Sequence, residues 1–141
     1  MILYLDTSVL VATLTREAKT ARMQRWLDDQ NSELLAISDW VTTEFSSALS
    51  IKLRSGEIEP KHRADALTMF TTMSVETFSR LPISGAQFRT AARLADQHAL
   101  GLRAGDALHL AICADHGATL CTLDRRLSEA GPALGVKTTL L

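Results

Sequence analysis

Cysteine, proline, glycine and aromatic residues are all scarce in this sequence. Its 141 residues include two cysteines, three prolines and seven glycines, and 5% are aromatic. Cys113 and Cys121 lie in apolar runs without a further cysteine or a histidine pair beside them, so their spacing excludes a zinc site and predicts small buried hydrophobes. So few prolines and glycines leave no room for a long linker, and the length fits a single domain over residues 1–141.

Long apolar runs and an excess of either charge are also missing. No apolar stretch approaches the ~18 residues of a membrane span. The apolar run at the N-terminus is short and follows no basic region, so we expect no signal peptide and a cytoplasmic location. The net charge of -1 gives no overall sign of nucleic-acid binding. If four of the 16 acidic residues serve one site, however, the remaining chain is basic, with 15 Lys and Arg.

The N-terminal segment combines a strand, an acidic residue and a helix. Residues 2–5 form an apolar run without turn residues, which is typical of a strand buried on both faces. Asp6, Thr7 and Ser8 follow, and each can cap the helix that the apolar residues up to Leu14 predict. Functional residues of parallel α/β sheets gather at the carboxyl ends of the strands, which is where Asp6 stands. The simpler interpretation is that Asp6 is only an N-cap.

The rest of the chain alternates helices with short apolar strands. Strands are predicted at residues 34–37, 81–83, 118–122 and 136–140, and helices at 17–31, 40–54, 61–73, 84–99 and 104–114, with a short helix from about residue 125. The helices on either side of Pro60 form a predicted helical hairpin at about 40–73. This alternation predicts an α/β domain with a mainly parallel sheet that is covered on both faces.

Glu44 lies where its helix is expected to bury apolar side chains. It stands too far from Ser38 and Asp39 to close a capping box. It falls instead on an apolar stripe made of Val41, Phe45, Ala48 and Leu49. A carboxylate on such a stripe is unusual unless it is paired or bound to a cation. A functional role for Glu44 is therefore as well supported as a structural one.

Two more acidic residues stand in comparable places in the second half of the chain. Asp106 lies in the first turn of a helix that is apolar on most of its surface, where a carboxylate also stabilises the helix dipole. Asp124 comes just after the predicted strand at 118–122 and so repeats the position of Asp6. His109 shares a helix face with Asp106, and we predict a packed, hydrogen-bonded histidine there rather than a metal ligand.

These four carboxylates can meet at one edge of the sheet. Right-handed crossovers place all strand-to-helix turns on the same edge, so Asp6 and Asp124 meet if their strands are neighbours. Glu44 and Asp106 join them if their helices flank those strands. Carboxylates in one pocket repel, and the cluster persists only with bound cations or raised pKa values. Ligands that are all oxygen favour Mg²⁺ or Mn²⁺, and a metal held by carboxylates suits phosphodiester hydrolysis.

Four segments, in this order, carry the acids: LDTSVLVA with Asp6, SDWVTTEF with Glu44, RAGDALHLA with Asp106 and TLDRRL with Asp124. No single segment is specific, but together they cover the whole chain. The sequence resembles the PIN domain, and more narrowly the VapC ribonuclease toxins of bacterial VapBC toxin–antitoxin pairs.

The resemblance implies a three-layer α/β/α sandwich with a central parallel sheet. It implies a Mg²⁺- or Mn²⁺-dependent endoribonuclease that forms a homodimer and is inhibited by a small VapB-type antitoxin, for which we expect the hairpin to provide the docking surface. The residues that match the family are Asp6 and Asp106, which would hold the metal, Glu44 and Asp124, which would complete the catalytic pocket, and Thr7, Ser8 and Thr122, whose hydroxyls would support it.

Three arginines flank two of the acids in sequence. We predict that Arg103, Arg125 and Arg126 contact RNA phosphates, because an acidic pocket needs nearby positive charge to accept a polyanion. A solvated helix face is the alternative for each of them.

Two other functions compete with the ribonuclease. One is a non-catalytic binding module of the same fold, with the acids as caps and surface charges, against which the position of Glu44 argues. The other is a metal-dependent enzyme with a different substrate, either a DNA nuclease or a phosphatase. A phosphatase with an aspartyl nucleophile would usually have a second Asp two residues after the first, where this chain has Ser8.

Overall fold

Five short parallel strands form the centre of the structure. The computed structural model describes all 141 residues, and its sheet has the strand order β3-β2-β1-β4-β5. The strands are β1 (Leu3–Leu5), β2 (Leu35–Ser38), β3 (Ser79–Leu81), β4 (Thr119–Thr122) and β5 (Thr138–Leu140). Because β1 pairs in parallel with both β2 and β4, the carboxyl ends of these three strands lie at one edge of the sheet.

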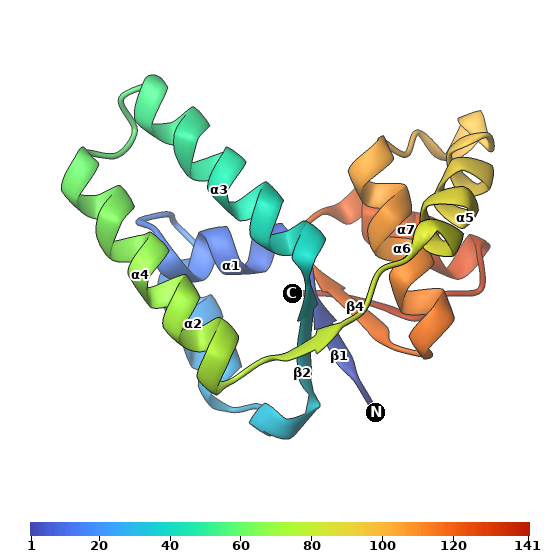
Figure 1. The fold of residues 1–141 in the computed structure, drawn as a ribbon, viewed down its shortest axis with the longest axis horizontal. Helices are drawn as coiled ribbons and strands as arrows, with labels where there is room; N and C mark the ends of the chain where they lie inside the picture. Colours follow the sequence, from blue (N-terminus) through green and yellow to red (C-terminus); the bar gives the residue numbers. More distant parts are fainter.

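Helices cover both faces of this sheet. They are α1 (Thr7–Leu14), α2 (Thr20–Asp28), α3 (Asp39–Arg54), α4 (Pro60–Glu76), α5 (Gly85–Ala95), α6 (Ala104–His116) and α7 (Arg125–Ala133), with short 3-10 turns at Ser32–Leu34 and His98–Leu100. Helices α1 to α4 gather on one side of the strands and α5 to α7 on the other (Figure 1). The predicted α/β/α sandwich is confirmed, and its sheet is parallel throughout. None of the helices has the length and apolar character required to cross a membrane.

Several element boundaries differ from the predicted ones for local reasons. The third strand is Ser79–Leu81 rather than 81–83, because Pro82 has no N–H to donate to the ladder. Helix α5 ends at Ala95, and the chain then turns through Gly101 at a φ of 66° before α6 begins. The last strand begins at Thr138 rather than at residue 136.

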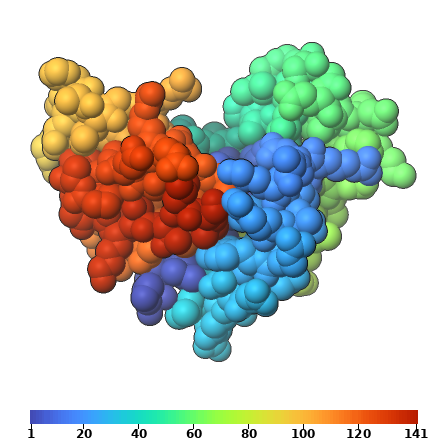
Figure 2. All heavy atoms as spheres, turned by 180° about the vertical axis from the view of Figure 1, so that it is seen from behind, coloured from blue at the N-terminus to red at the C-terminus, as the bar shows by residue number.

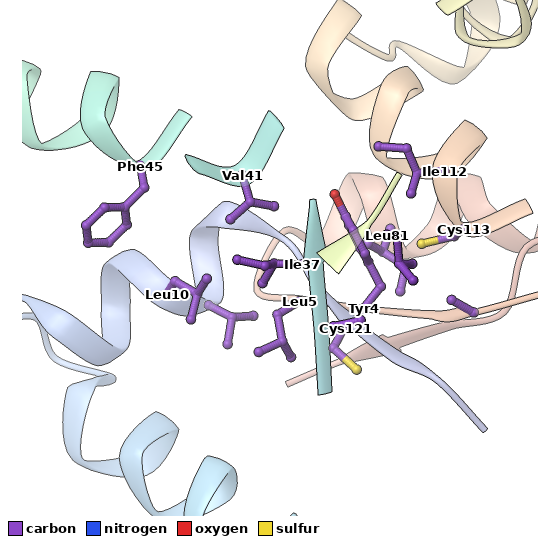
Figure 3. Close-up of a cluster of buried hydrophobic side chains, with 14 of the residues drawn as sticks. Tyr4, Leu5, Leu10, Ile37, Val41, Phe45, Leu81, Ile112, Cys113 and Cys121 are labelled. Atoms are coloured by element: carbon purple, nitrogen blue, oxygen red, sulfur yellow. The ribbon is translucent and has the colours of Figure 1, made fainter. Parts of the chain in front are cut away.

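The core packs the sheet against α1 and α3 on one side and α6 on the other. Figure 3 shows this cluster, with Leu5 and Leu10 on the side of α1 and Tyr4 reaching toward α6. Cys113 and Cys121 are buried free thiols, as predicted, and burial raises their pKa values.

The long helices α3 and α4 form a helical hairpin that projects from one end of the molecule (Figure 1). The rings of Phe45 and Phe70 stack between them, with centroids 4.4 Å apart. Phe45 is fully buried, so it fixes the rotation of α3 and with it the direction of the neighbouring Glu44 side chain.

Candidate active site

The predicted site residues lie around the carboxyl ends of β1 and β4. Asp6 follows β1, Asp124 follows β4 and caps α7, and Asp106 stands in the first turn of α6. Glu44 comes from the second turn of α3. In the space-filling view the surface is hollowed between α3, in teal, and the segment that leads into α6, in yellow and orange (Figure 2).

Asp6 is a buried carboxylate held by hydroxyl groups. The residue is 4% exposed, and its side chain accepts hydrogen bonds from Ser8 Oγ at 2.5 Å on Oδ1 and from Thr122 Oγ1 at 2.5 Å on Oδ2. Its Oδ1 also accepts from the backbone N–H of Val9 at 3.3 Å, so Asp6 does cap α1. Burial raises the pKa of Asp6, against the opposing influence of His109 and of these hydrogen bonds. No Lys or Arg forms an ion pair with it.

The same two hydroxyls tie Asp6 to the segment after β4. Thr122 Oγ1 accepts a hydrogen bond from the backbone N–H of Asp124 at 2.9 Å. Ser8 Oγ accepts one from the backbone N–H of Leu123 at 3.1 Å. A single hydroxyl, that of Thr122, therefore bridges the Asp6 carboxylate and the backbone of Asp124. This bridge fixes the end of β1 relative to the end of β4.

Glu44 reaches the site through Thr7 and His109. Its Oε1 accepts hydrogen bonds from Thr7 Oγ1 at 2.7 Å and from His109 Nε2 at 2.5 Å. The side chain is 30% exposed. Burial alone would raise the pKa of Glu44, but the hydrogen bond and the charge of His109, together with the hydrogen bond from Thr7, hold it below its usual value. Glu44 is therefore an ionised carboxylate at neutral pH.

Gly105 allows Glu44 to approach α6. A Cβ atom at this position would lie 2.7 Å from Glu44 Oε2 and 3.3 Å from Trp40 Nε1. Because Gly105 has no side chain, the Glu44 carboxylate has room beside the first turn of α6. Gly105 directly precedes Asp106 in the sequence.

Asp106 and Asp124 line one open pocket of about 420 Å³, together with Gly101, Arg103 and Arg126. Each also makes a capping bond: Asp106 Oδ2 accepts from the backbone N–H of Arg103 at 3.1 Å, and Asp124 Oδ1 from that of Leu127 at 3.2 Å. Arg125 is exposed and does not line this pocket. The pocket therefore combines two carboxylates with two guanidinium groups.

The four carboxylates are connected but do not form a ready-made metal site. Asp6 is joined to the backbone of Asp124 through Thr122 and lies next in sequence to Thr7, which donates to Glu44. Glu44 Oε2 lies beside Gly105, the residue before Asp106. No group of three or more His, Cys, Asp or Glu side chains is arranged to hold a metal ion. The oxygen-only donors and the unpaired buried charge of Asp6 fit a hard divalent cation, so ligation by Asp6 and Asp106 stays a prediction.

Two residues of this region, Tyr4 and Ser38, have no role in the sequence-based prediction. Their hydroxyl oxygens lie 2.7 Å apart, and the Tyr4 hydroxyl lies 2.8 Å from His109 Nδ1. The available signal was a tyrosine within a fully buried strand, since a buried tyrosine hydroxyl usually has a hydrogen-bond partner. The packed, hydrogen-bonded environment predicted for His109 is confirmed.

The family model of the PIN domain matches residues 3–131. The chain therefore belongs to the PIN-domain family. A comparison with curated proteins found no significant match.

Solved structures with similar folds include FitAcB from Neisseria gonorrhoeae, with 19% identity, coverage of 97% of this chain and 96% of that one, and a TM-score of 0.68. VapBC2 from Rickettsia felis, bound to a DNA fragment from its promoter, has 16% identity, coverage of 100% and 99%, and a TM-score of 0.70. VapC20 from Mycobacterium tuberculosis, a toxin that cleaves the sarcin–ricin loop, has 16% identity, coverage of 92% and 95%, and a TM-score of 0.75. At these sequence identities the likeness shows a shared fold and nothing further.

The raised pKa of Asp6 predicts a pH dependence of stability. Since the folded pKa lies above the ordinary 3.8, the folded protein binds more protons than the unfolded chain between pH 3.8 and the folded pKa. The free energy of unfolding of the metal-free protein should therefore fall as the pH rises through this window. Glu44, with its lowered pKa, acts in the other direction and only at lower pH, where its contribution is lost as the pH falls below 4.5.

The measurement is urea unfolding with a chelator present, from about pH 4 to pH 8, for the wild type and Asp6→Asn. In the variant the fall with rising pH should disappear, because Asn carries no charge to desolvate. Asp28→Asn, at an exposed position on α2, is the matched control and should follow the wild type. Parallel stability curves for the wild type and Asp6→Asn would contradict the assignment.

Proposed function

We propose that this PIN-domain protein is a metal-dependent endoribonuclease that acts as the toxin of a toxin–antitoxin pair. The observation that supports this most directly is the Asp6 carboxylate, which is buried, held by three hydrogen bonds and paired with no cationic side chain. A charge kept in this way costs stability, which indicates a purpose other than folding. VapC20, which is similar in fold, is a toxin that cleaves the sarcin–ricin loop.

Each group has a distinct part in the proposed hydrolysis. Asp6 and Asp106 would hold Mg²⁺ or Mn²⁺, which when bound supplies an acidified water and offsets charge on the phosphate. The Glu44 carboxylate, ionised at neutral pH, accepts a hydrogen bond from the attacking water on Oε2, because Thr7 and His109 already donate to Oε1. Asp124, which lines the same pocket as Asp106, would complete the acidic wall.

The first prediction from this proposed function concerns the four acids. The single changes Asp6→Asn, Glu44→Gln, Asp106→Asn and Asp124→Asn should each abolish most Mn²⁺-dependent cleavage of a mixed RNA pool, because residues that act as a unit are not additive. The double change Asp6→Asn with Asp106→Asn should be little worse than either alone. Adding Mn²⁺ should raise the melting temperature less in Asp6→Asn and in Asp106→Asn than in the wild type, because this rise depends on metal affinity.

Asp28→Asn again provides the control and should cleave like the wild type. A single-stranded DNA pool, assayed in parallel, distinguishes a ribonuclease from a DNA nuclease. If the acids are only helix caps, the Asp6 and Asp106 variants will lose about 1 kcal/mol of stability each and keep their activity. Four active variants with unchanged responses to Mn²⁺ would refute the proposed nuclease.

The second prediction concerns phosphate binding. Arg103 and Arg126 line the pocket with two of the acids, whereas Arg125 does not. Arg103→Gln and Arg126→Gln should each weaken RNA binding and reduce the slope of log K against log salt by about one. Arg125→Gln should change the slope less. Binding titrations between about 50 and 200 mM salt measure this, and wild-type slopes for all three variants would exclude phosphate contacts by these arginines.

The third prediction concerns partners. We propose a homodimer that binds a VapB-type antitoxin at the hairpin of α3 and α4. A groove of about 360 Å³ lies between this hairpin, the end of α1 and α2. Four of its eleven lining residues are apolar, and the rest are polar or charged; the apolar ones are Leu14, Ile58, Ala66 and Met69. Such a groove suits an amphipathic helix, while a basic side chain of the antitoxin would reach the acids. FitAcB and VapBC2, both similar in fold, support a two-component system.

Light scattering of the isolated protein at micromolar concentration should give the mass of a dimer. Co-expression with the small protein encoded beside it should give a stable complex, and Met69→Glu in the groove should weaken that complex without changing RNA cleavage. A monomeric protein contradicts the dimer, and failure of the two proteins to co-purify contradicts the antitoxin.

A further inference from the structure

A chain of buried polar side chains runs from β2 to the site through β1 and α6. Ser38 Oγ lies 2.7 Å from the Tyr4 hydroxyl, which lies 2.8 Å from His109 Nδ1, and His109 Nε2 lies 2.5 Å from Glu44 Oε1. Ser38, Tyr4 and His109 are all buried. Figure 3 shows the Tyr4 side chain reaching out of the sheet toward α6, the helix that carries Ile112.

The chemistry of these partners determines where the hydrogen on the imidazole lies. An ionised carboxylate only accepts hydrogen bonds, so His109 Nε2 must carry a hydrogen and donate it to Glu44. His109 Nδ1 faces a hydroxyl that can donate or accept, and the Ser38 hydroxyl can complement either choice. The network therefore presents an N–H to Glu44 in the neutral and in the protonated state of the imidazole alike.

The hydrogen bonds also distinguish the two oxygens of Glu44. Oε1 accepts from both Thr7 and His109, whereas Oε2 accepts no hydrogen bond from the protein and lies beside Gly105. Two donors on one oxygen, from α1 and α6, restrict rotation about the last bonds of the side chain. This arrangement leaves Oε2 available to bind water or another ligand.

We infer that His109 is a positioning residue for Glu44, and that Tyr4 and Ser38 hold its imidazole in the orientation that this requires. The inference deepens the proposed nuclease function and rests on it for its consequence in catalysis. Partners of this kind orient ligating or catalytic groups, and their loss typically costs about 10- to 100-fold in activity. Tyr4 stands two residues before Asp6 on β1, so the same strand carries one acid and anchors the network that orients another.

The kinetic experiment compares the wild type with His109→Leu, His109→Gln and Tyr4→Phe. His109→Leu removes the donor and should lower kcat by roughly 10- to 100-fold with the KM for RNA nearly unchanged, because Glu44 acts on the reacting water and not on RNA binding. His109→Gln places an amide N–H near the position of Nε2 and should restore most of the loss. Tyr4→Phe keeps the ring in the core and should give a smaller loss of the same kind.

His116→Gln provides the matched control, since it changes a half-buried histidine at the C-terminal end of the same helix, and it should behave like the wild type. Melting temperatures identify any variant that fails to fold. If folded His109→Gln and His109→Leu lose activity equally, or if the loss lies in KM, the positioning role is refuted.

A spectroscopic experiment tests the arrangement without any nuclease assay. The wild type labelled with ¹⁵N in its four histidines, free of metal, should show a hydrogen on Nε2 of His109. In Glu44→Ala this resonance should shift more than those of the other three histidines. An Nε2 without hydrogen in the wild type would overturn the inference. If the spectra show both expected features but the wild type cleaves no RNA, the proposed nuclease function is wrong and the His109–Glu44 arrangement stands.

Discussion

The parallel pairing of β1 with β4 is the constraint on which the site depends. The register places Leu5 opposite Cys121, and the backbone N–H of Asp6 donates to the Cys121 carbonyl at 3.1 Å. The carboxyl ends of β1 and β4, which are more than a hundred residues apart in sequence, are thereby held side by side. The Thr122 hydroxyl can then bridge them. Both ends face the helices that carry Glu44 and Asp106, so the sheet provides a rigid base for side chains from four elements.

Capping and function are combined in the same carboxylates. Asp6 and Asp124 each accept a backbone N–H in the first turn of the helix that follows, and Asp106 accepts the N–H of Arg103. A capping bond is typically worth about 1 kcal/mol, which partly offsets the cost of gathering acids near one edge. Capping therefore does not exclude a catalytic role, and for Asp6 the additional hydroxyl donors and the deep burial exceed what a cap requires.

The hairpin of α3 and α4 provides Glu44, the one of the four acids that makes no capping bond. Phe45 packs fully into the core and stacks on Phe70, and this directs the adjacent Glu44 toward α1 and α6 rather than toward solvent. Apolar packing thus orients a charged side chain, and the absence of a side chain at Gly105 leaves space for it. The position of a carboxylate on the apolar stripe of α3 is thus explained by its contacts with α1 and α6 and by the packing of α3 on α4.

The sequence by itself determined the alternation of strands and helices and the caps at Asp6 and Asp124, because hydrophobic periodicity and side-chain oxygens act over a few residues. It also predicted the four acids as a candidate site and a packed, hydrogen-bonded His109. Tertiary structure alone decided that β1 lies between β2 and β4, and that Tyr4 meets His109 and Glu44 meets Thr7. Tyr4 and His109 are 105 residues apart, and no local pattern encodes which buried hydroxyl meets which imidazole. That choice follows from the packing of α6 on the sheet, where every buried polar group must find its partner.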